Sequence, residues 1–394
     1  MKSILLQPEI QDYIQHHLDT DPDTLVFKKS PFPEVSMPQL IQQIKAKQKI
    51  KKKLPTWFGT SKIYYPEKIS LEQTSSEKTA TYKASLMSGK SVIDLTGGFG
   101  VDCFSFAKKF ERVTHLEINK SLSEIAASNF KQLGLTNIAC EATEAISFLK
   151  RTTERYDWIY ADPSRRDHQK GKVFLLSDCT PDIPKNLSWI WNKTNQLFLK
   201  TAPLLDIQQG INELQNVKEV HVVALKNEVK ELNWILKKAY EGPILITCIN
   251  LDSKSKLPFS FEYHTEKDMD IAFSNPLSYL YEPNAAILKA GAFKTIAHQY
   301  NIAKIARHSH LYTSMKNIAF PGRSFLIKEV LPFQKKSIKK RLAKVKAHIT
   351  TRNFPWSVAK LRKEFQIHDG GDLFIFFTTN LEDNYIAIIC KKTI

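Results

Sequence analysis

Hydrophobic positions in the middle of the chain form seven short apolar runs, and polar residues separate each run from the next. Between several runs the apolar residues recur every three or four positions, as in residues 121–134, which is typical of an amphipathic helix. The apolar runs occupy residues 91–96, 113–118, 137–142, 156–162, 195–202, 218–226 and 243–250. Strands that alternate with helices in this way predict an α/β fold with a doubly wound, Rossmann-like and mostly parallel sheet.

The pattern changes towards the end of this region. Residues 227–240 have the spacing of a helix, and the apolar runs on either side of them are expected to form an antiparallel edge of the sheet. The polar stretch at 252–256 then marks a boundary. Beyond it we expect an α+β region with a helix at 285–300, a strand at 324–331, a basic helix, and closing strands at 372–379 and 385–390.

The N-terminal segment reads as helical and basic. Met37, Leu40, Ile41 and Ile44 recur at helical spacing after Ser36, which suits an N-cap. Together with the later boundary, this predicts a chain of three parts: a helical segment at 1–74, a central domain at 75–252 and a basic α+β accessory domain at 253–394.

The charge balance favours a polyanionic partner. The chain has 57 Lys and Arg residues against 40 Asp and Glu residues, a formal net charge of +17. Clustered cations bind phosphate chains because they displace condensed counterions. A basic protein with no nucleic-acid role would show the same balance, so the distribution of the charges has to decide.

Cysteine usage and hydropathy narrow the class of protein further. The five cysteines are scattered and include no C-x-x-C pair, so we expect no disulfide framework and no metal. The N-terminus becomes polar and acidic too soon for a secretory signal, and no apolar run is as long as a membrane span. We therefore expect a cytoplasmic protein with no membrane partner.

The most specific signal is a glycine-rich turn directly after the first apolar run. Asp94 ends the strand, and Gly97, Gly98 and Gly100 follow before the next helix. In a doubly wound sheet, ligands bind beyond the carboxyl ends of the strands, and glycines let the backbone approach them closely. The spacing differs from the dinucleotide fingerprint G-x-G-x-x-G, and Asp94 would repel a phosphate. A ligand with a positive amino group suits this turn better, although a tight strand–helix connection would also explain the glycines.

Two further acids occupy matching positions on the next strands. Glu117 ends the second apolar run about twenty residues after the glycines, where a carboxylate can accept both ribose hydroxyls. Glu141 ends the third run and could meet an adenine amino group. Each acid alone is typical of a solvated loop, but three at the ends of consecutive strands favour one nucleoside-containing ligand.

These residues resemble the class I S-adenosylmethionine-dependent methyltransferases over roughly residues 75–250. The sequence DLTGGFG resembles the first motif of that family, Glu117 its ribose-binding acid, and Glu141-Ala142 its adenine-side pair. The resemblance implies that S-adenosyl-L-methionine is the cofactor. The residues that it implies for binding this cofactor are Asp94, Thr96, Gly97, Gly98, Phe99, Gly100, Glu117, Ile118, Glu141, Ala142 and Asp162.

The fourth strand leads into Asp162-Pro163, at the position of the family's motif IV. In amino-group methyltransferases of this family, the carboxylate and the prolyl carbonyl of motif IV accept hydrogen bonds from the target amine. The resemblance therefore makes Asp162 and Pro163 the catalytic candidates. Ser164 and Arg165 replace the second proline and the aromatic residue of the family pattern. This departure argues against a methyltransferase of DNA adenine or cytosine. Arg165 and Arg166 could bind a substrate phosphate or carboxylate, or could pair with Asp167 on a solvated surface.

The segment before the glycine turn is rich in hydroxyls and aromatics at 64–68 and 75–79. Similar lead-in helices in the trimethylguanosine-synthase-like branch of the family touch cofactor and substrate, so the resemblance implies a lid here. Ordinary helix packing is the alternative.

A basic stretch near the C-terminus is the second candidate surface. Residues 331–363 contain eleven Lys and Arg residues and no Asp or Glu. Ile338, Leu342, Val345 and Ile349 have helical spacing, so one helix is expected to present the lysines outwards. Lys339, Lys340 and Lys344 are the candidates for binding RNA phosphates. The C-terminal region, with PGRSF and HDGGDLFIFFTT, resembles a THUMP-like domain in a bacterial methyltransferase family.

The sequence therefore predicts an S-adenosylmethionine-dependent methyltransferase that acts on RNA, either tRNA or rRNA, at an exocyclic amine. Methylation of a small molecule or a protein is one alternative. An inactive methyltransferase fold that serves as an RNA-binding module is another.

Overall fold

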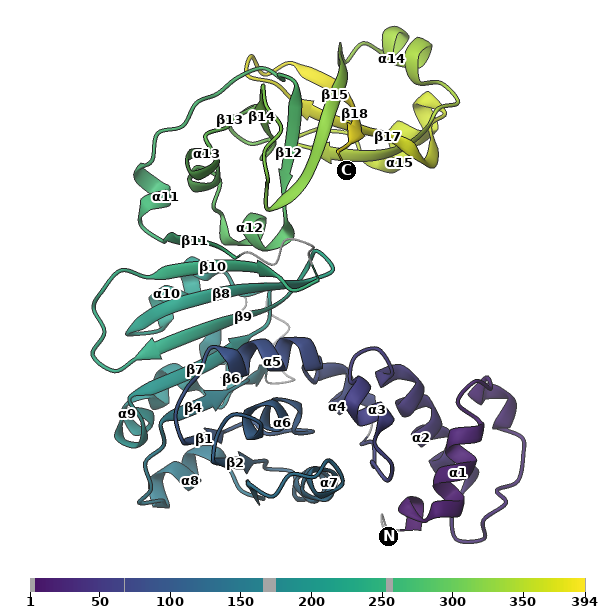
Figure 1. Ribbon diagram of the computed structural model, residues 1–394, viewed down its shortest axis with the longest axis vertical. Coiled ribbons are helices and arrows are strands. Elements are labelled where there is room, and N and C mark those ends of the chain that lie inside the picture. Colours follow the sequence, from purple (N-terminus) through teal and green to yellow (C-terminus); the bar gives the residue numbers. More distant parts are fainter. Residues whose placement is uncertain (1–3, 67, 166–174, 253–257, 394) are drawn as a thin grey trace. The chain divides into compact units, whose positions relative to one another are not determined.

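The computed structural model describes residues 4–66, 68–165, 175–252 and 258–393. It contains two compact units (Figure 1). The first comprises Met1–Lys218 and Leu232–Glu241, and the second comprises Glu219–Glu231 and Gly242–Ile394. The division into three parts at residues 74 and 252 stays a prediction.

Helices form the N-terminal part of the first unit. The longest, α2, begins after Ser36, whose backbone N–H donates to Gln39 Oε1 at 2.9 Å, as in a capping box. Leu40 and Ile44 of α2 are buried in a small core that they share with Ile10 and Ile14. The helices of this part are α1 (Pro8–His16), α2 (Met37–Ile50), α3 (Pro55–Gly59), α4 (Lys68–Gln73) and α5 (Glu77–Ser85).

A mostly parallel sheet forms the centre of the first unit. Its strands run in the order β9-β7-β4-β1-β2-β3, and all are parallel except β9, which is antiparallel to β7. The strands are β1 (Ser91–Asp94), β2 (Arg112–Leu116), β3 (Ile138–Glu141), β4 (Trp158–Ala161), β7 (Gln196–Thr201) and β9 (Glu228–Lys237). The predicted α/β class with a doubly wound sheet is confirmed.

Helices cover both faces of this sheet (Figure 1). Helices α6 (Val101–Ala107) and α7 (Lys120–Gln132) share one core with β1, β2, β4 and β7, and α8 (Ala145–Arg151) and α9 (Ile183–Lys193) lie on the opposite face. The chain lays down β1, β2 and β3 in one direction and returns to β4 beside β1. The carboxyl ends of β1 and β4 therefore flank the switch point at which ligands bind in such folds.

The prediction of a helix at 227–240 is wrong, because residues 228–237 form strand β9. Lys226 and Asn227 both have positive φ, 54° and 60°, and connect β8 (Val217–Leu225) to β9. Two such residues form the tight turn whose twist suits a β-hairpin. The run at 231–236 is buried at every position, which reflects burial on both faces of a strand.

The antiparallel edge expected from the last two apolar runs is also wrong. β10 (Leu245–Asn250) pairs with β8 in parallel, and the antiparallel partner of β10 is β11 (Phe259–Glu262). Strand β9 returns the chain as a crossover helix would have done, so β10 runs in the same direction as β8.

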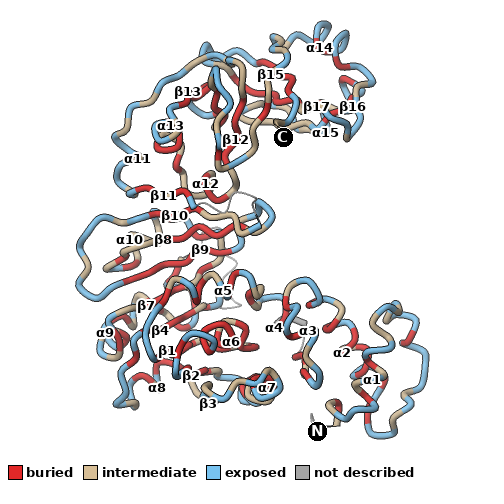
Figure 2. The backbone as a smooth tube through the Cα atoms, in the orientation of Figure 1, coloured by how far each residue is buried: buried red, intermediate tan, exposed pale blue. Residues whose placement is uncertain are grey.

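The second unit ends in a seven-stranded sheet with the order β13-β14-β12-β15-β18-β17-β16. One of its faces is covered by α14 (Lys335–Leu342) and α15 (Val358–Phe365), and Figure 2 shows the buried residues of β12 in red. The strands are β12 (Tyr279–Pro283), β13 (Ala303–Lys304), β14 (Tyr312–Ser314), β15 (Gly322–Pro332), β16 (Lys346–Arg352), β17 (His368–Thr379) and β18 (Tyr385–Lys392).

Two predicted helices in this unit are shorter than expected. Gly291, at φ 72°, ends α12 (Ala285–Ala290), and α13 (Thr295–Tyr300) follows as a separate helix. The basic helix ends at Leu342, so Ile349 lies in β16 instead. Ile338 and Leu342 are buried as expected. The helix cannot continue, because residues 346–352 pair in parallel with β17.

Candidate cofactor and active site

The glycine turn connects β1 to α6, and its three glycines serve different purposes. A Cβ at Gly97 would lie 2.4 Å from the ring of His115, and one at Gly100 would lie 2.3 Å from the ring of Phe130. Both positions are therefore closed to side chains by packing. Gly98 has φ 53°, and a Cβ there would meet nothing nearer than Thr96 O at 3.8 Å. The turn thus presents open space at Gly98, where a ligand can approach the backbone.

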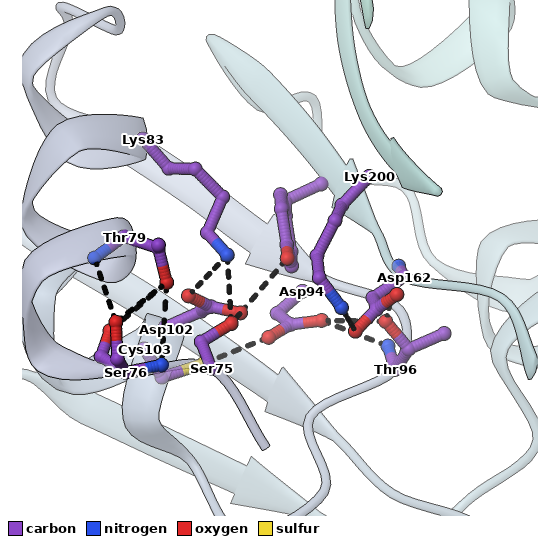
Figure 3. Close-up of polar contacts among 11 residues, drawn as sticks. Ser75, Ser76, Thr79, Lys83, Asp94, Thr96, Asp102, Cys103, Asp162 and Lys200 are labelled. Carbon is purple, nitrogen blue, oxygen red and sulfur yellow. Dashed lines mark hydrogen bonds and ion pairs between the residues drawn. The ribbon is translucent and has the colours of Figure 1, made fainter. Parts of the chain in front are cut away.

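Asp94 holds this turn from inside the protein. Its side chain is buried and accepts hydrogen bonds from Thr96 N at 2.8 Å and from Cys103 Sγ at 3.3 Å (Figure 3). Burial raises the pKa of Asp94 to about 7, from an ordinary value of 3.8. The carboxyl group is therefore divided between its two protonation states near neutral pH.

Glu117 is fixed against the same turn by backbone donors. Gly98 N donates to Glu117 Oε2 at 3.0 Å, and Asn119 N donates to Oε1 at 2.8 Å. The next residue, Ile118, is 72% exposed although it is a large apolar side chain. The oriented carboxylate of Glu117 can accept hydrogen bonds from a ribose, and the exposed side chain of Ile118 can contact the flat face of a base.

Three acids predicted for the cofactor lie at one edge of the sheet. Asp94 and Glu141 are the last residues of β1 and β3, and Glu117 follows β2, which lies between them in the sheet. Glu117 N donates to Glu141 O at 3.1 Å, and the side chains of Glu141 and Ala142 are exposed. Phe99 differs from this group because it is buried against the ring of Trp57, at a centroid distance of 4.5 Å. Only its backbone can reach a ligand.

Asp162 and Pro163 come directly after β4, across the switch point from the glycine turn. Asp162 N donates to Thr96 Oγ1 at 2.7 Å, and Thr96 Oγ1 in turn donates to Asp94 Oδ1 at 3.1 Å. This links the two sides of the site. Asp162 Oδ2 forms an ion pair with Lys200 Nζ of β7 at 2.5 Å (Figure 3). Lys200 was not predicted as a site residue, because in the sequence it is only one polar residue within an apolar strand.

A buried network of charges lies beside the site and was also missed. Lys83 of α5 is fully buried, and its Nζ lies 3.0 Å from Asp102 Oδ1 and donates to Ser75 Oγ at 2.7 Å (Figure 3). Tyr160 OH donates to Asp102 Oδ2 at 2.8 Å. Burial alone would raise the pKa of Asp102, but the charges of Lys83 and Lys200 hold it below its ordinary value. The network joins α5 to the first turn of α6.

The aromatics of the lead-in segment are packed rather than free. Tyr65 is buried, and its hydroxyl donates to Trp57 O at 3.1 Å. Tyr64 exchanges backbone hydrogen bonds with the side chain of Asn129 on α7, at 3.0 and 2.8 Å. These contacts are those of ordinary packing, and the role of the segment as a lid stays a prediction.

None of the predicted substrate residues has a described side chain in the first unit. Arg166 and the side chain of Arg165 lie outside the described residues. Lys339 and Lys340 are exposed on α14, and Lys344 is exposed beyond the end of that helix with φ 64°. These three lysines belong to the second unit, whereas Asp162 belongs to the first.

Within the residues that the structure describes, no helix is long and apolar enough to cross a membrane. No group of three or more His, Cys, Asp or Glu side chains that could hold a metal ion occurs in the described parts of the chain.

Comparison with known proteins places the whole chain. Residues 279–321 match a family described as a ferredoxin-like domain, and residues 322–392 match one described as THUMP domain-like. The crystal structure of a "putative methyltransferase" from Porphyromonas gingivalis W83 is 30% identical in sequence and covers 100% of this chain and 99% of its own, with a TM-score of 0.87. This chain belongs to that methyltransferase family. Its central sheet is doubly wound, and its residues 322–392 match the THUMP domain-like model.

Other solved structures resemble only part of this methyltransferase. An rRNA methylase from Streptococcus thermophilus is 13% identical and covers 40% of this chain and 93% of its own, with a TM-score of 0.31. An S-adenosylmethionine-dependent O-methyltransferase from Thermotoga maritima is 14% identical and covers 43% of this chain and 68% of its own, with a TM-score of 0.31. No curated protein matches the sequence.

Proposed function

We propose that this protein transfers a methyl group from S-adenosyl-L-methionine to an exocyclic amine of RNA. The observation that carries the proposal is the position of Asp162 and Pro163. They follow β4 at the switch point, and Thr96 ties them to the glycine turn. An acceptor bound at Asp162 would thus adjoin a cofactor bound at the turn.

The residues around the turn fit S-adenosyl-L-methionine. The open backbone at Gly98 suits the methionine portion, Glu117 suits the ribose hydroxyls, and Ile118 suits the apolar face of adenine. The edge at Glu141 and Ala142 would border the adenine. When bound, this cofactor supplies an activated methyl group on a sulfonium, so the protein needs only to align the acceptor and exclude water.

Asp162 and Pro163 would align the acceptor. A carboxylate oxygen and the prolyl carbonyl can both accept hydrogen bonds from one amine, which directs the nitrogen lone pair away from them. Lys200 restrains Oδ2 of Asp162, so the carboxylate keeps one orientation while its side chain stays 28% exposed. Transfer would form the nitrogen–carbon bond while the methyl carbon–sulfur bond of the cofactor breaks, and Asp162 could accept the proton that the amine then loses.

The basic charge and the THUMP-like domain support RNA as the substrate. The net charge of +17 favours a phosphate chain, and the exposed lysines of α14 are one place where it could bind. The departure at Ser164 and Arg165 from the pattern of DNA base methyltransferases also favours RNA over DNA.

The decisive experiment measures transfer to RNA. The full-length protein is incubated with labelled S-adenosyl-L-methionine and with RNA from cells that lack this protein. The nucleosides of the RNA are then analysed by mass spectrometry. Asp162→Ala should lower the rate by at least about a hundredfold, because it removes the group that orients and deprotonates the amine. Cofactor affinity should hardly change.

Glu124→Gln is the matched control, since Glu124 is an exposed acid on α7. It should methylate at the rate of the unmodified protein. Full activity of Asp162→Ala would refute the role of motif IV, and transfer to a protein or a metabolite instead of RNA would refute the substrate.

A further inference from the structure

The two faces of the C-terminal sheet differ in what covers them. Helices α14 and α15 pack on one face, with Ile338, Leu342 and Phe365 in the core beneath them. The opposite face packs partly against Ile305 and Leu311, which join its own smaller core. The part of this face on β15, β16, β17 and β18 that lies beyond that core carries exposed and half-buried side chains.

Strand register identifies the residues of this open face. His348 of β16 lies opposite Phe374 of β17, which lies opposite Cys390 of β18. Lys392 is two residues beyond Cys390, so it points to the same side, and it lies opposite Phe325 of β15. Alternation along β15 and β16 adds the remaining members. We define the open face as Arg323, His348, Thr350, Arg352, Phe374 and Lys392.

Two arginines on the open face share one buried carboxylate. Glu282 of β12 is 3% exposed and accepts from Arg323 Nε at 2.7 Å and from Arg352 Nη2 at 2.7 Å. The side chains of Arg323 and Arg352 are 38% and 36% exposed. One carboxylate cannot neutralise two guanidinium groups, so the cluster keeps an excess positive charge. It also holds both groups in fixed positions, which favours binding of a phosphate.

Aromatic rings lie beside these cations. The ring of His348 stacks on Phe374 at a centroid distance of 4.8 Å and an interplanar angle of 27°, and the His348 side chain is 45% exposed. The guanidinium of Arg323 lies 5.5 Å from the centroid of the Phe325 ring. Two acids approach this face. Asp369 Oδ1 lies 3.9 Å from His348 Nδ1 and also pairs with Arg362 at 2.5 Å, and the exposed Asp372 precedes Phe374 by two residues on β17, next to the position of Lys392 on β18.

Room for a ligand exists next to the cations. An open hollow of about 430 Å³ borders Arg323 and Lys392, and its other walls include Asn317, Gly322 and Thr393. Gly322 itself must stay without a side chain, since a Cβ there would lie 2.1 Å from Glu282 O.

We propose that the open face binds a single-stranded segment of the RNA substrate. Fixed guanidinium groups and Lys392 would contact phosphates, and the exposed His348 ring would stack on a base. Cations interleaved with stacking rings suit a single strand, because a duplex hides the faces of its bases. The proposal rests on RNA being the substrate, and it assigns the contact to the face of the sheet that α14 does not cover.

Because α14 packs on the other face, two sets of variants can separate the surfaces. Binding of a fluorescent twelve-nucleotide single-stranded RNA of mixed sequence to the full-length protein is measured at several salt concentrations. The double variant His348→Ala/Lys392→Gln should bind at least about tenfold more weakly, from one lost stack and one lost phosphate contact. Its slope of log affinity against log salt should flatten by about 0.7.

The competing surface is tested with Lys339→Gln/Lys340→Gln on α14, and the matched control is Lys363→Gln, an exposed lysine of α15, which should bind the single strand as the unmodified protein does. Loss of binding in Lys339→Gln/Lys340→Gln together with normal binding of His348→Ala/Lys392→Gln would overturn the proposal. So would equal binding of single-stranded RNA and of the same sequence as a duplex. Arg323 is tested with Arg323→Lys, because a lysine can still pair with Glu282. This variant should bind the single strand at least about threefold more weakly. Thermal melting checks that it is folded.

Transfer assays keep this proposal distinct from the proposed function. If the unmodified protein methylates RNA while His348→Ala/Lys392→Gln binds and methylates normally, only the open face is refuted. If the open face binds RNA as described and no nucleoside is methylated, only the transferase activity is refuted.

Discussion

Each unit of this protein buries a carboxylate among cations, and the two clusters are built differently. In the first unit Asp102 faces Lys83, which is itself fully buried, and accepts a further hydrogen bond from Tyr160. In the second unit Glu282 is shared by Arg323 and Arg352, whose side chains are more than one-third exposed. A cation that is buried with its carboxylate holds helices together. Cations that reach the solvent remain available to a ligand.

The strongest test of this difference removes the buried cation. Lys83→Met leaves Asp102 without the ammonium at 3.0 Å, and water cannot replace it at a fully buried position. We expect a loss of about 3–5 kcal/mol in the free energy of unfolding, which urea denaturation followed by circular dichroism would measure. Lys185→Met on the exposed surface of α9 is the control and should change it by less than about 0.5 kcal/mol. If Lys83→Met lowered the free energy of unfolding by as little as the control does, Lys200 would be sufficient to neutralise Asp102.

Asp94 sharpens the comparison, because burial acts on it without a cation in hydrogen-bonding contact with its oxygens among the described residues. Its pKa in the folded state, about 7, exceeds the ordinary 3.8, so the folded state holds this proton more tightly. The unmodified protein should therefore lose stability relative to Asp94→Asn as the pH rises from 3.8 to about 7, by up to about 4 kcal/mol.

Denaturation of both proteins at a series of pH values measures this difference, which should level off above pH 7. A difference that grows in the opposite direction, with Asp94→Asn losing stability as the pH rises, would show that Asp94 is ionised when folded.

Glu117 represents a third environment, in which two backbone N–H groups donate to the carboxylate. Glu117→Ala should weaken binding of S-adenosyl-L-methionine by about 1–3 kcal/mol, from the lost ribose hydrogen bonds and the loosened turn at Gly98. Calorimetric titration measures the affinity. Glu124→Gln should bind as the unmodified protein does, and equal affinity in Glu117→Ala would place the ribose elsewhere.

The smallest effect is expected in the second unit. Glu282→Gln removes a charge but leaves two arginines that water already reaches, so the free energy of unfolding should fall by only about 1 kcal/mol. Urea denaturation of Glu282→Gln and of Lys83→Met under the same conditions compares the two losses in the free energy of unfolding. An equal loss in the two variants would erase the distinction between the clusters.

The sequence predicted the first unit well where local patterns decide structure. Parallel strands that are buried on both faces appear as continuous apolar runs, and β1, β2, β3, β4 and β7 were all found in this way. The same property misled the analysis at β9, where a buried run and helical spacing cannot be distinguished over ten residues. The Lys226-Asn227 turn was the local signal that could have decided it.

The candidate site shows the same limit. The glycine turn, Glu117 and Asp162 belong to contiguous motifs, so the sequence could reveal them. The partners of these residues come from distant positions: Lys83 meets Asp102, and Lys200 meets Asp162, only because the fold brings separate elements together. The basic helix was extended too far because Val345 and Ile349 continue its spacing by coincidence while the backbone has already become a strand.

The hairpin between β8 and β9 has a consequence for how the chain is synthesised. The first unit takes β9 from residues that follow its continuous part, so a ribosome that has released Lys218 has not yet released the strand that pairs with β7. Until then β7 is an unprotected edge, with its backbone donors and acceptors open to any other strand. A fragment that ends at Lys218 would keep β7 as an open edge, whereas in one that extends to Glu241 strand β9 could pair with β7 and the open edge would pass to β8.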